Sequence, residues 1–245
     1  MTTDGRRGAG HSHGDNGHGT VTASGTHVLV LAGGGYSQHA PHEAEPVVEW
    51  LAGLGIRASV FRYPLHTRHP VPLQALRREI RRRRDAGAGA DRIGIVGFSA
   101  GGHLAGLAAL APRSDERESV DFVVIGYAIT SMETETYRPA RIILLGEHAT
   151  PQRRREVSLD ALVTPSAPPF FIWHTAEDIY VPPEHTYRFA RALASNDVAH
   201  TVHVFAHGPH SLGLARGPGD AAIWTTLAAT WIAERVGEAV LERDA

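Results

Sequence analysis

The chain of 245 residues has no cysteine, little net charge and no apolar run long enough to cross a bilayer. The lack of cysteine excludes disulfides and thiolate chemistry, and it leaves the redox compartment open. A net charge of −2 gives no reason to expect nucleic acid or an anionic membrane surface as a partner. The expected partner is therefore a small molecule.

Residues 1–25 differ in composition from the rest, being rich in Gly, His, Ser and Thr with almost nothing apolar to bury. We predict a disordered tail here and one folded domain over 26–245. His11, His13 and His18 could bind a divalent metal loosely, but we favour solvated side chains because a His-rich composition alone fixes no coordination geometry. The polar start also lacks the apolar region of a secretory signal, so the expected location is cytoplasmic.

Apolar, β-rich runs alternate with helical patterns after the tail. Strands are expected near 27–32, 56–62, 92–97, 121–127, 169–174 and 200–205, and helices near 41–54, 71–86, 100–111, 184–195 and 219–236. This alternation predicts an α/β fold with a mostly parallel sheet of about six strands flanked by helices. Prolines interrupt the rhythm over 128–168, which we interpret either as a cap over a substrate pocket or as a passive connection.

The most informative run is Gly97-Phe98-Ser99-Ala100-Gly101, which follows an apolar strand and opens a helix of small residues. A G-x-S-x-G sequence in this context predicts a sharp strand-to-helix turn that raises the serine hydroxyl above the sheet. The glycines are needed because a Cβ on either side of Ser99 would have no room. Ser99 is therefore the candidate nucleophile.

A serine nucleophile needs a histidine base and an acid that orients the base, in the chain order Ser, Asp or Glu, His. Glu177 and Asp178 both follow a late strand, and the D-x-x-V-P spacing favours Asp178 at the loop apex. Two histidines follow the last strand. We favour His210 over His207 because the preceding Gly208 lets the loop turn back toward the serine.

Acyl transfer also needs donors for the developing oxyanion. One would be the backbone N–H of Ala100, and the other would come from Gly34 or Gly35 in the Gly-rich loop after the first strand. Such a loop could instead hold a phosphate, but the G-x-G-x-x-G and G-K-[ST] continuations are missing.

Three aromatic residues and a histidine lie in or near these motifs. Tyr36 and Tyr137 are candidates for lining the substrate pocket. Trp173 is explained equally well by the pocket and by the core. His103, within the helix after the serine, is interpreted as a packed structural histidine. No metal and no cofactor are expected.

Four motifs in this order resemble the α/β-hydrolase esterases of the acetylxylan esterase or BD-FAE-like type, which are related to dienelactone hydrolases and the hormone-sensitive-lipase type. The resemblance covers roughly residues 27 to 236. The motifs are Gly33-Gly34-Gly35-Tyr36-Ser37, the run from Gly97 to Ala105, His174-Thr175-Ala176-Glu177-Asp178 with Val181-Pro182, and His207-Gly208-Pro209-His210-Ser211-Leu212-Gly213-Leu214.

The resemblance implies an α/β-hydrolase fold with a minimal N-terminus, lacking the two leading strands of larger hydrolases. It further implies a carboxylic-ester hydrolase that favours short acyl groups such as acetate, with Ser99, Asp178 and His210 as triad. Alternatives stay open: an amidase or peptidase, a deacetylase of a specialised metabolite, and a non-catalytic binding protein. The sheet of a minimal hydrolase could also extend through a partner, which leaves a homodimer open.

Overall fold

The computed structural model describes Met1 and residues 25–85, 90–217 and 219–237. The predicted tail over 1–25 lies outside these ranges except for its two end residues, so its disorder stays a prediction. Within the described ranges, none of the helices is both long enough and apolar enough to pass through a membrane.

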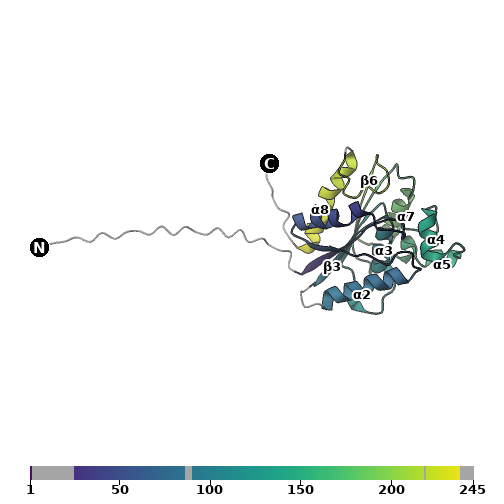
Figure 1. The fold of residues 1–245 in the computed structure, drawn as a ribbon, viewed down its shortest axis with the longest axis horizontal. Coiled ribbons are helices and arrows are strands. Elements are labelled where there is room, and N and C mark those ends of the chain that lie inside the picture. Colours follow the sequence, from purple (N-terminus) through teal and green to yellow (C-terminus); the bar gives the residue numbers. More distant parts are fainter. Residues whose placement is uncertain (2–24, 86–89, 218, 238–245) are drawn as a thin grey trace.

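Six strands form one sheet in the order β2-β1-β3-β4-β5-β6, and every neighbouring pair is parallel. The strands are β1 (Thr26–Leu31), β2 (Arg57–Val60), β3 (Arg92–Phe98), β4 (Phe122–Gly126), β5 (Phe170–Thr175) and β6 (His200–Phe205). Figure 1 shows the sheet running through the molecule with helices on both sides. The predicted parallel sheet of about six strands is confirmed.

The larger helices are α1 (Glu45–Gly53), α2 (Val71–Asp85), α3 (Ser99–Leu110), α7 (Glu184–Ser195) and α8 (Trp224–Val236). Shorter helices are α4 (Arg138–Leu145), α5 (Pro151–Arg155) and α6 (Leu159–Leu162), together with the 3-10 turns η1 (Pro41–Glu43), η2 (Glu116–Glu118) and η3 (Asp220–Ile223). The single helix expected over 41–54 is wrong at one point. It breaks at Ala44, whose φ of −106° and ψ of −104° are not helical.

Alternation along the strands divides the core between the two faces of the sheet. Val28 and Val30 of β1 join the cluster that includes residues of α1 and α8, whereas Leu29 and Leu31 join the cluster formed with α2, α3 and α7. Helices α2 and α8 accordingly lie on opposite sides of the sheet (Figure 1). Both faces are covered, as parallel sheets require.

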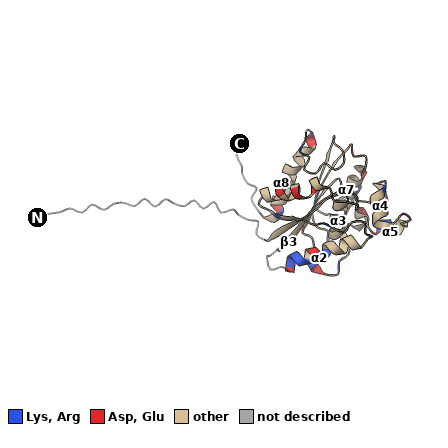
Figure 2. Ribbon diagram, in the orientation of Figure 1, with Lys and Arg blue, Asp and Glu red and all other residues tan. Residues whose placement is uncertain are grey.

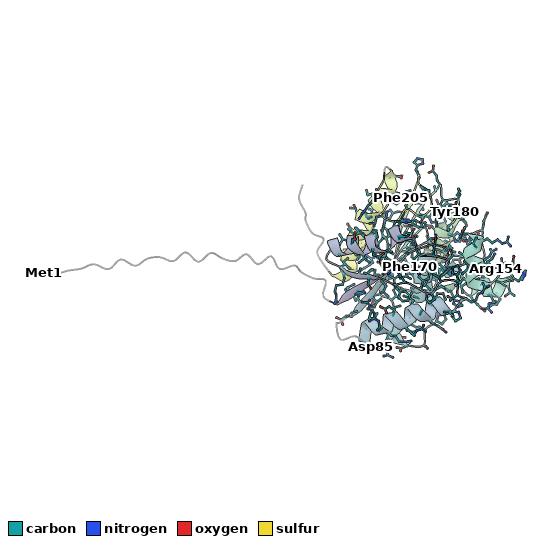
Figure 3. All side chains as sticks on the ribbon, viewed as in Figure 1. Met1, Asp85, Arg154, Phe170, Tyr180 and Phe205 are labelled. Carbon is teal, nitrogen blue, oxygen red and sulfur yellow. The ribbon has the colours of Figure 1, made fainter. Side chains whose placement is uncertain are left out.

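Large aromatic side chains fill this core. Trp173 of β5 is fully buried and stacks on Trp224 of α8, with ring centroids 4.8 Å apart. Figure 3 shows Phe170, which begins the same strand, within the body of the molecule, and Arg154 of α5 at its edge. Trp173 is thus a core residue rather than a pocket residue.

The arginine-rich half of α2 forms the most prominent basic stretch of the ribbon (Figure 2). Most of these arginines form ion pairs with carboxylates. Glu118 pairs with Arg77 and Arg81, and Glu79 pairs with Arg82 and Arg83. The pair of Arg82 with Glu79 is partly exposed and contributes little stability, whereas Glu118 is buried beside Arg77 and Arg81. The helix presents a solvated, largely neutralised face.

His103 of α3 is fully buried between two hydrogen-bond partners. Its Nε2 lies 2.7 Å from the carbonyl oxygen of Val157 and donates to it, so Nδ1 accepts the hydroxyl of Tyr36 at 2.6 Å. Burial lowers the pKa of His103 to about 4, although the Val157 hydrogen bond works in the opposite direction. The interpretation of His103 as a packed structural histidine is confirmed.

This pKa predicts a loss of stability on mild acidification. Between the unfolded value of about 6.5 and the folded value of about 4, the unfolded chain binds a proton that the folded chain does not, so unfolding becomes easier as pH falls. His103 should account for about 2 kcal/mol between pH 7 and pH 5. In urea unfolding at both values, His103→Gln should reduce the pH-dependent loss, whereas the same change at the exposed His148 should leave the loss as in the wild type. Equal losses in all three proteins would contradict the prediction.

Candidate active site

The turn between β3 and α3 is set by close backbone contacts. A Cβ on Gly101 would lie 2.2 Å from the carbonyl oxygen of Leu31, and one on Gly97 would lie 2.7 Å from the carbonyl oxygen of Gly101. The start of α3 therefore packs directly on the end of β1. Between the two glycines, Ser99 adopts a φ of 50°, a left-handed conformation that a non-glycine residue rarely takes. The G-x-S-x-G pattern reflects these contacts.

The hydroxyl of Ser99 lies in a continuous chain of hydrogen bonds. Its Oγ is 2.9 Å from Nε2 of His210, and Nδ1 of the same ring is 2.6 Å from Oδ2 of Asp178. The ionised carboxylate of Asp178 can only accept, so Nδ1 carries the proton and Nε2 is free to accept the serine O–H. The structure thus brings together three residues from loops that follow β3, β5 and β6.

Asp178 is buried and surrounded by donors. Oδ1 accepts the backbone N–H groups of Tyr180 and Val181, each at 2.9 Å, and Oδ2 also lies 3.2 Å from Nε2 of His174. Burial disfavours the charged carboxylate, but the hydrogen bonds from His174, His210 and the backbone outweigh it and hold the pKa of Asp178 well below its ordinary value. Asp178 therefore keeps its charge beside His210.

The neighbouring candidates form a separate pair at the surface. His207 Nδ1 is 3.0 Å from Glu177 Oε1, and both side chains are more than half exposed. Glu177 also accepts the backbone N–H of Gly208 at 2.9 Å. This pair holds the base of the loop that carries His210, and no hydrogen bond of the described residues links it to Ser99.

The Gly-rich loop after β1 runs against the serine turn. A Cβ on Gly33 would lie 2.9 Å from Cβ of Ser99, so this loop and the turn are in contact. Gly34 and Gly35 have φ values of 117° and 63°. Their N–H groups have no protein acceptor among the described residues, whereas the N–H of Gly33 donates to a carboxylate. Ala100 is the second residue of α3, where a backbone N–H has no acceptor within the helix.

Two partly exposed tyrosines lie around these groups. Tyr137, just before α4, is so close to the loop that a Cβ on Gly35 would lie 3.0 Å from its ring. The ring of Tyr180 lies 6.0 Å from that of Tyr137 and 6.0 Å from that of His210. Tyr36 differs, because its side chain is fully buried and faces the core. The sequence predicted that Tyr36 lines the substrate pocket, but the structure places its ring in the core.

Comparison with known proteins gives this geometry a family. A family model described as BD-FAE matches residues 74–193. The chain is 31% identical over 209 residues to endo-1,4-beta-xylanase B of Butyrivibrio fibrisolvens. The aligned region covers 77% of this chain and 32% of that protein. The chain thus spans about a third of the length of this curated relative.

Solved structures extend the likeness over most of the fold. An acetyl ester-xyloside bifunctional hydrolase from Caldicellulosiruptor lactoaceticus has a TM-score of 0.81 and 36% identity, covering 87% of this chain and 84% of its own. A carboxylesterase from Lactobacillus plantarum has a TM-score of 0.75 and 28% identity, covering 88% of both chains. The chain belongs to the BD-FAE-type esterases of the α/β-hydrolase fold.

The structure of this BD-FAE-type chain also reveals residues that sequence reasoning missed. His174, at the end of β5, donates from Nε2 to Asp178 and to the carbonyl oxygen of Val181 at 2.9 Å. The fully buried carboxylate of Glu43 accepts a hydrogen bond from the backbone N–H of Gly33. The His-Thr-Ala-Glu-Asp run gave a weak signal for His174, because the residue lies four positions before Asp178. Nothing local in the sequence distinguishes Glu43.

The packing of the turn predicts that Gly101→Ala destabilises the fold strongly. The added methyl group would meet two backbone carbonyl oxygens, of Leu31 and Ala32, which cannot rotate away. We expect a loss of at least about 2 kcal/mol in the free energy of unfolding. Gly53→Ala is the matched control, because nothing lies within 4 Å of its Cβ position and alanine favours helix there. Denaturant unfolding of both variants measures this difference. Equal free energies of unfolding for the two variants would refute the steric argument.

Proposed function

We propose that the protein is a serine carboxylesterase that hydrolyses short-chain acyl esters, acetyl esters foremost, through an acyl-enzyme. The observation that carries this proposal is the chain of hydrogen bonds from Asp178 through His210 to Ser99. A non-catalytic binding protein has no need of a strained serine, a correctly oriented imidazole and free N–H groups in one place.

The first half of the reaction uses each group in turn. His210 takes the proton of Ser99 as Oγ attacks the ester carbonyl, and Asp178 stabilises the resulting imidazolium. The carbonyl oxygen becomes an oxyanion and accepts hydrogen bonds from the N–H groups of Ala100 and of Gly34 or Gly35. The alcohol then leaves with the proton held by His210, and the acyl group stays on Ser99.

Water completes the reaction by the same route. His210 removes a proton from water, whose oxygen attacks the acyl-enzyme, and the carboxylic acid is released as Ser99 regains its proton. These steps need no group beyond the residues of this chain. Tyr137 and Tyr180 border the position that the ester would occupy, and we assign the walls of the substrate site to them.

The acetyl preference draws on the relatives. The Caldicellulosiruptor enzyme is named for acetyl esters and xylosides, and the Butyrivibrio protein for xylan. We therefore propose that the substrate of this chain has a short acyl group and a leaving alcohol with further hydroxyl groups, as in a sugar. Acetylated sugars tested beside other small acetylated metabolites would separate a carbohydrate esterase from a more specialised deacetylase.

The proposal predicts rapid hydrolysis of p-nitrophenyl acetate, slower hydrolysis of the butyrate and slowest of the octanoate. Ser99→Ala should lower kcat by at least about 10⁴-fold, because the nucleophile is lost. Initial rates of wild type and variant on the three esters, with a p-nitroanilide in parallel, measure this. An active Ser99→Ala protein would disprove the nucleophile, and comparable rates on the anilide would favour an amidase.

Asp178 and Glu177 offer a matched pair that tests which carboxylate orients His210. Asp178→Asn should lower kcat by about 10⁴-fold, since an amide favours the wrong tautomer of the imidazole. Glu177→Gln alters an exposed pair and should change kcat by no more than about threefold. The two kcat values on p-nitrophenyl acetate decide the assignment, and a larger effect at Glu177 would reverse it.

A further inference from the structure

Glu43 is a buried carboxylate whose hydrogen bonds reach two loops of the candidate site. It ends the turn η1, and its side chain is fully buried. Oε2 accepts the backbone N–H of Gly33 at 2.6 Å. Oε1 accepts the hydroxyl of Ser211 at 2.6 Å and that of Tyr127 at 2.8 Å.

These three donors come from segments far apart in the chain. Gly33 begins the Gly-rich loop whose next two N–H groups are free, and it touches Ser99. Ser211 directly follows His210 and has a φ of 67°, so the chain turns sharply there. One carboxylate therefore joins the loop assigned to oxyanion binding to the loop that carries the base.

Tyr127 strengthens this connection. Its hydroxyl donates to Glu43 and accepts the backbone N–H of Gly213 at 2.8 Å, which gives the histidine loop a second attachment. Its ring also packs against that of His210, with centroids 5.0 Å apart. Both the ring of His210 and the backbone beyond it are thus held by groups that depend on Glu43.

Stability alone does not explain a carboxylate in this place. Within the described part of the chain, only His42 brings a basic nitrogen within ion-pair distance of Glu43, at 3.6 Å, and the His42 side chain is half exposed. The other partners are neutral. A buried carboxylate is costly to desolvate, and such groups are weak contributors to stability. What Glu43 does provide is a fixed distance between two loops.

We propose that Glu43 is a positioning residue that sets the oxyanion loop and the His210 loop relative to each other and to Ser99. This inference rests on the proposed esterase function. A displacement of about 1 Å in a catalytic group can lower the rate by about 100-fold, so a single carboxylate that fixes both loops matters for turnover. It acts through Gly33, Ser211 and Tyr127.

The test uses Glu43→Gln and Ser211→Ala on p-nitrophenyl acetate. The amide has one acceptor oxygen, so it cannot serve both Gly33 and the two hydroxyls as the carboxylate does. We expect Glu43→Gln to lower kcat by roughly 10-fold to 100-fold, with KM changed by no more than about threefold. Ser211→Ala removes one attachment and should cost less. Because the two act through the same hydrogen bond, the double variant should lose less than the product of the single effects.

A boronic acid supplies a readout that a merely structural role would not move. It binds as Ser99 Oγ forms a bond to boron and the serine proton passes to His210, giving a tetrahedral adduct that resembles the reaction intermediate. Its Ki should rise in Glu43→Gln by about the same factor as kcat/KM falls. Ser211→Ala should raise Ki to a smaller extent, which keeps the test valid even where Glu43→Gln folds poorly.

The control is Glu118→Gln, which alters another buried glutamate beyond the far end of α3, where it pairs with Arg77 and Arg81. It should lower Tm and leave kcat and Ki within about twofold of wild type when assayed well below Tm. If Glu43→Gln and Ser211→Ala behave like this control, the inference is overturned, and the proposed esterase function is unaffected. A wild type inert toward esters and boronic acid would overturn the proposed function, and the inference with it.

Discussion

The contact between the start of α3 and the end of β1 is the constraint on which the rest of the site depends. Gly101 lies so close to the carbonyl oxygen of Leu31 that no side chain fits. That approach fixes Ser99 at the end of β3 and places the loop that follows β1 directly beside it. The candidate nucleophile and the free N–H groups of Gly34 and Gly35 therefore form one rigid unit, because the backbone that connects them belongs to two adjacent parallel strands.

The histidine loop is held by a close approach of Gly213 to the carbonyl oxygen of His42 and by hydrogen bonds to carboxylates. Asp178 fixes the imidazole of His210, and Glu43 fixes the following residue, Ser211. Each carboxylate accepts several hydrogen bonds, from four groups on Asp178 and from three on Glu43. They contrast with the partly exposed pair of Arg82 and Glu79 on α2, which neutralises charge and reaches no group of the candidate site.

What the sequence could predict was local. The glycines around Ser99, the apolar strand before it and the small residues after it lie within a dozen positions, so the turn was legible without knowing the fold. The preference for Asp178 over Glu177 rested on spacing, and the structure separates these neighbours because one side chain turns inward to the backbone N–H groups and the other remains in solvent. The alternation of strands and helices predicted a mostly parallel sheet of about six strands, and the order of the strands came from the structure.

Distant contacts outside the four motifs were beyond sequence reasoning. Glu43 meets Tyr127 and Ser211 across 84 and 168 positions. Only the topology, which collects the ends of parallel strands at one edge, makes these contacts possible. The helix break at Ala44 has a local cause instead, because Pro46 lies in the first turn of α1 and would interrupt a continuous helix over 41–54.

Tyr36 and Tyr137 both constrain the Gly-rich loop, one from the core and the other from the proposed substrate wall. The side chain of Tyr36 points from the Gly-rich loop into the core, where its hydroxyl forms a hydrogen bond with His103 and so attaches the loop to α3. Tyr137 approaches the same loop at Gly35 from the 128–168 segment, whose helix α4 is tied down by Arg68 at the carbonyl oxygen of Ile143. A change in that segment which moved Tyr137 would therefore also disturb Gly35. In the proposed esterase, substrate preference and oxyanion geometry are therefore coupled, because Tyr137 and Gly35 are in contact.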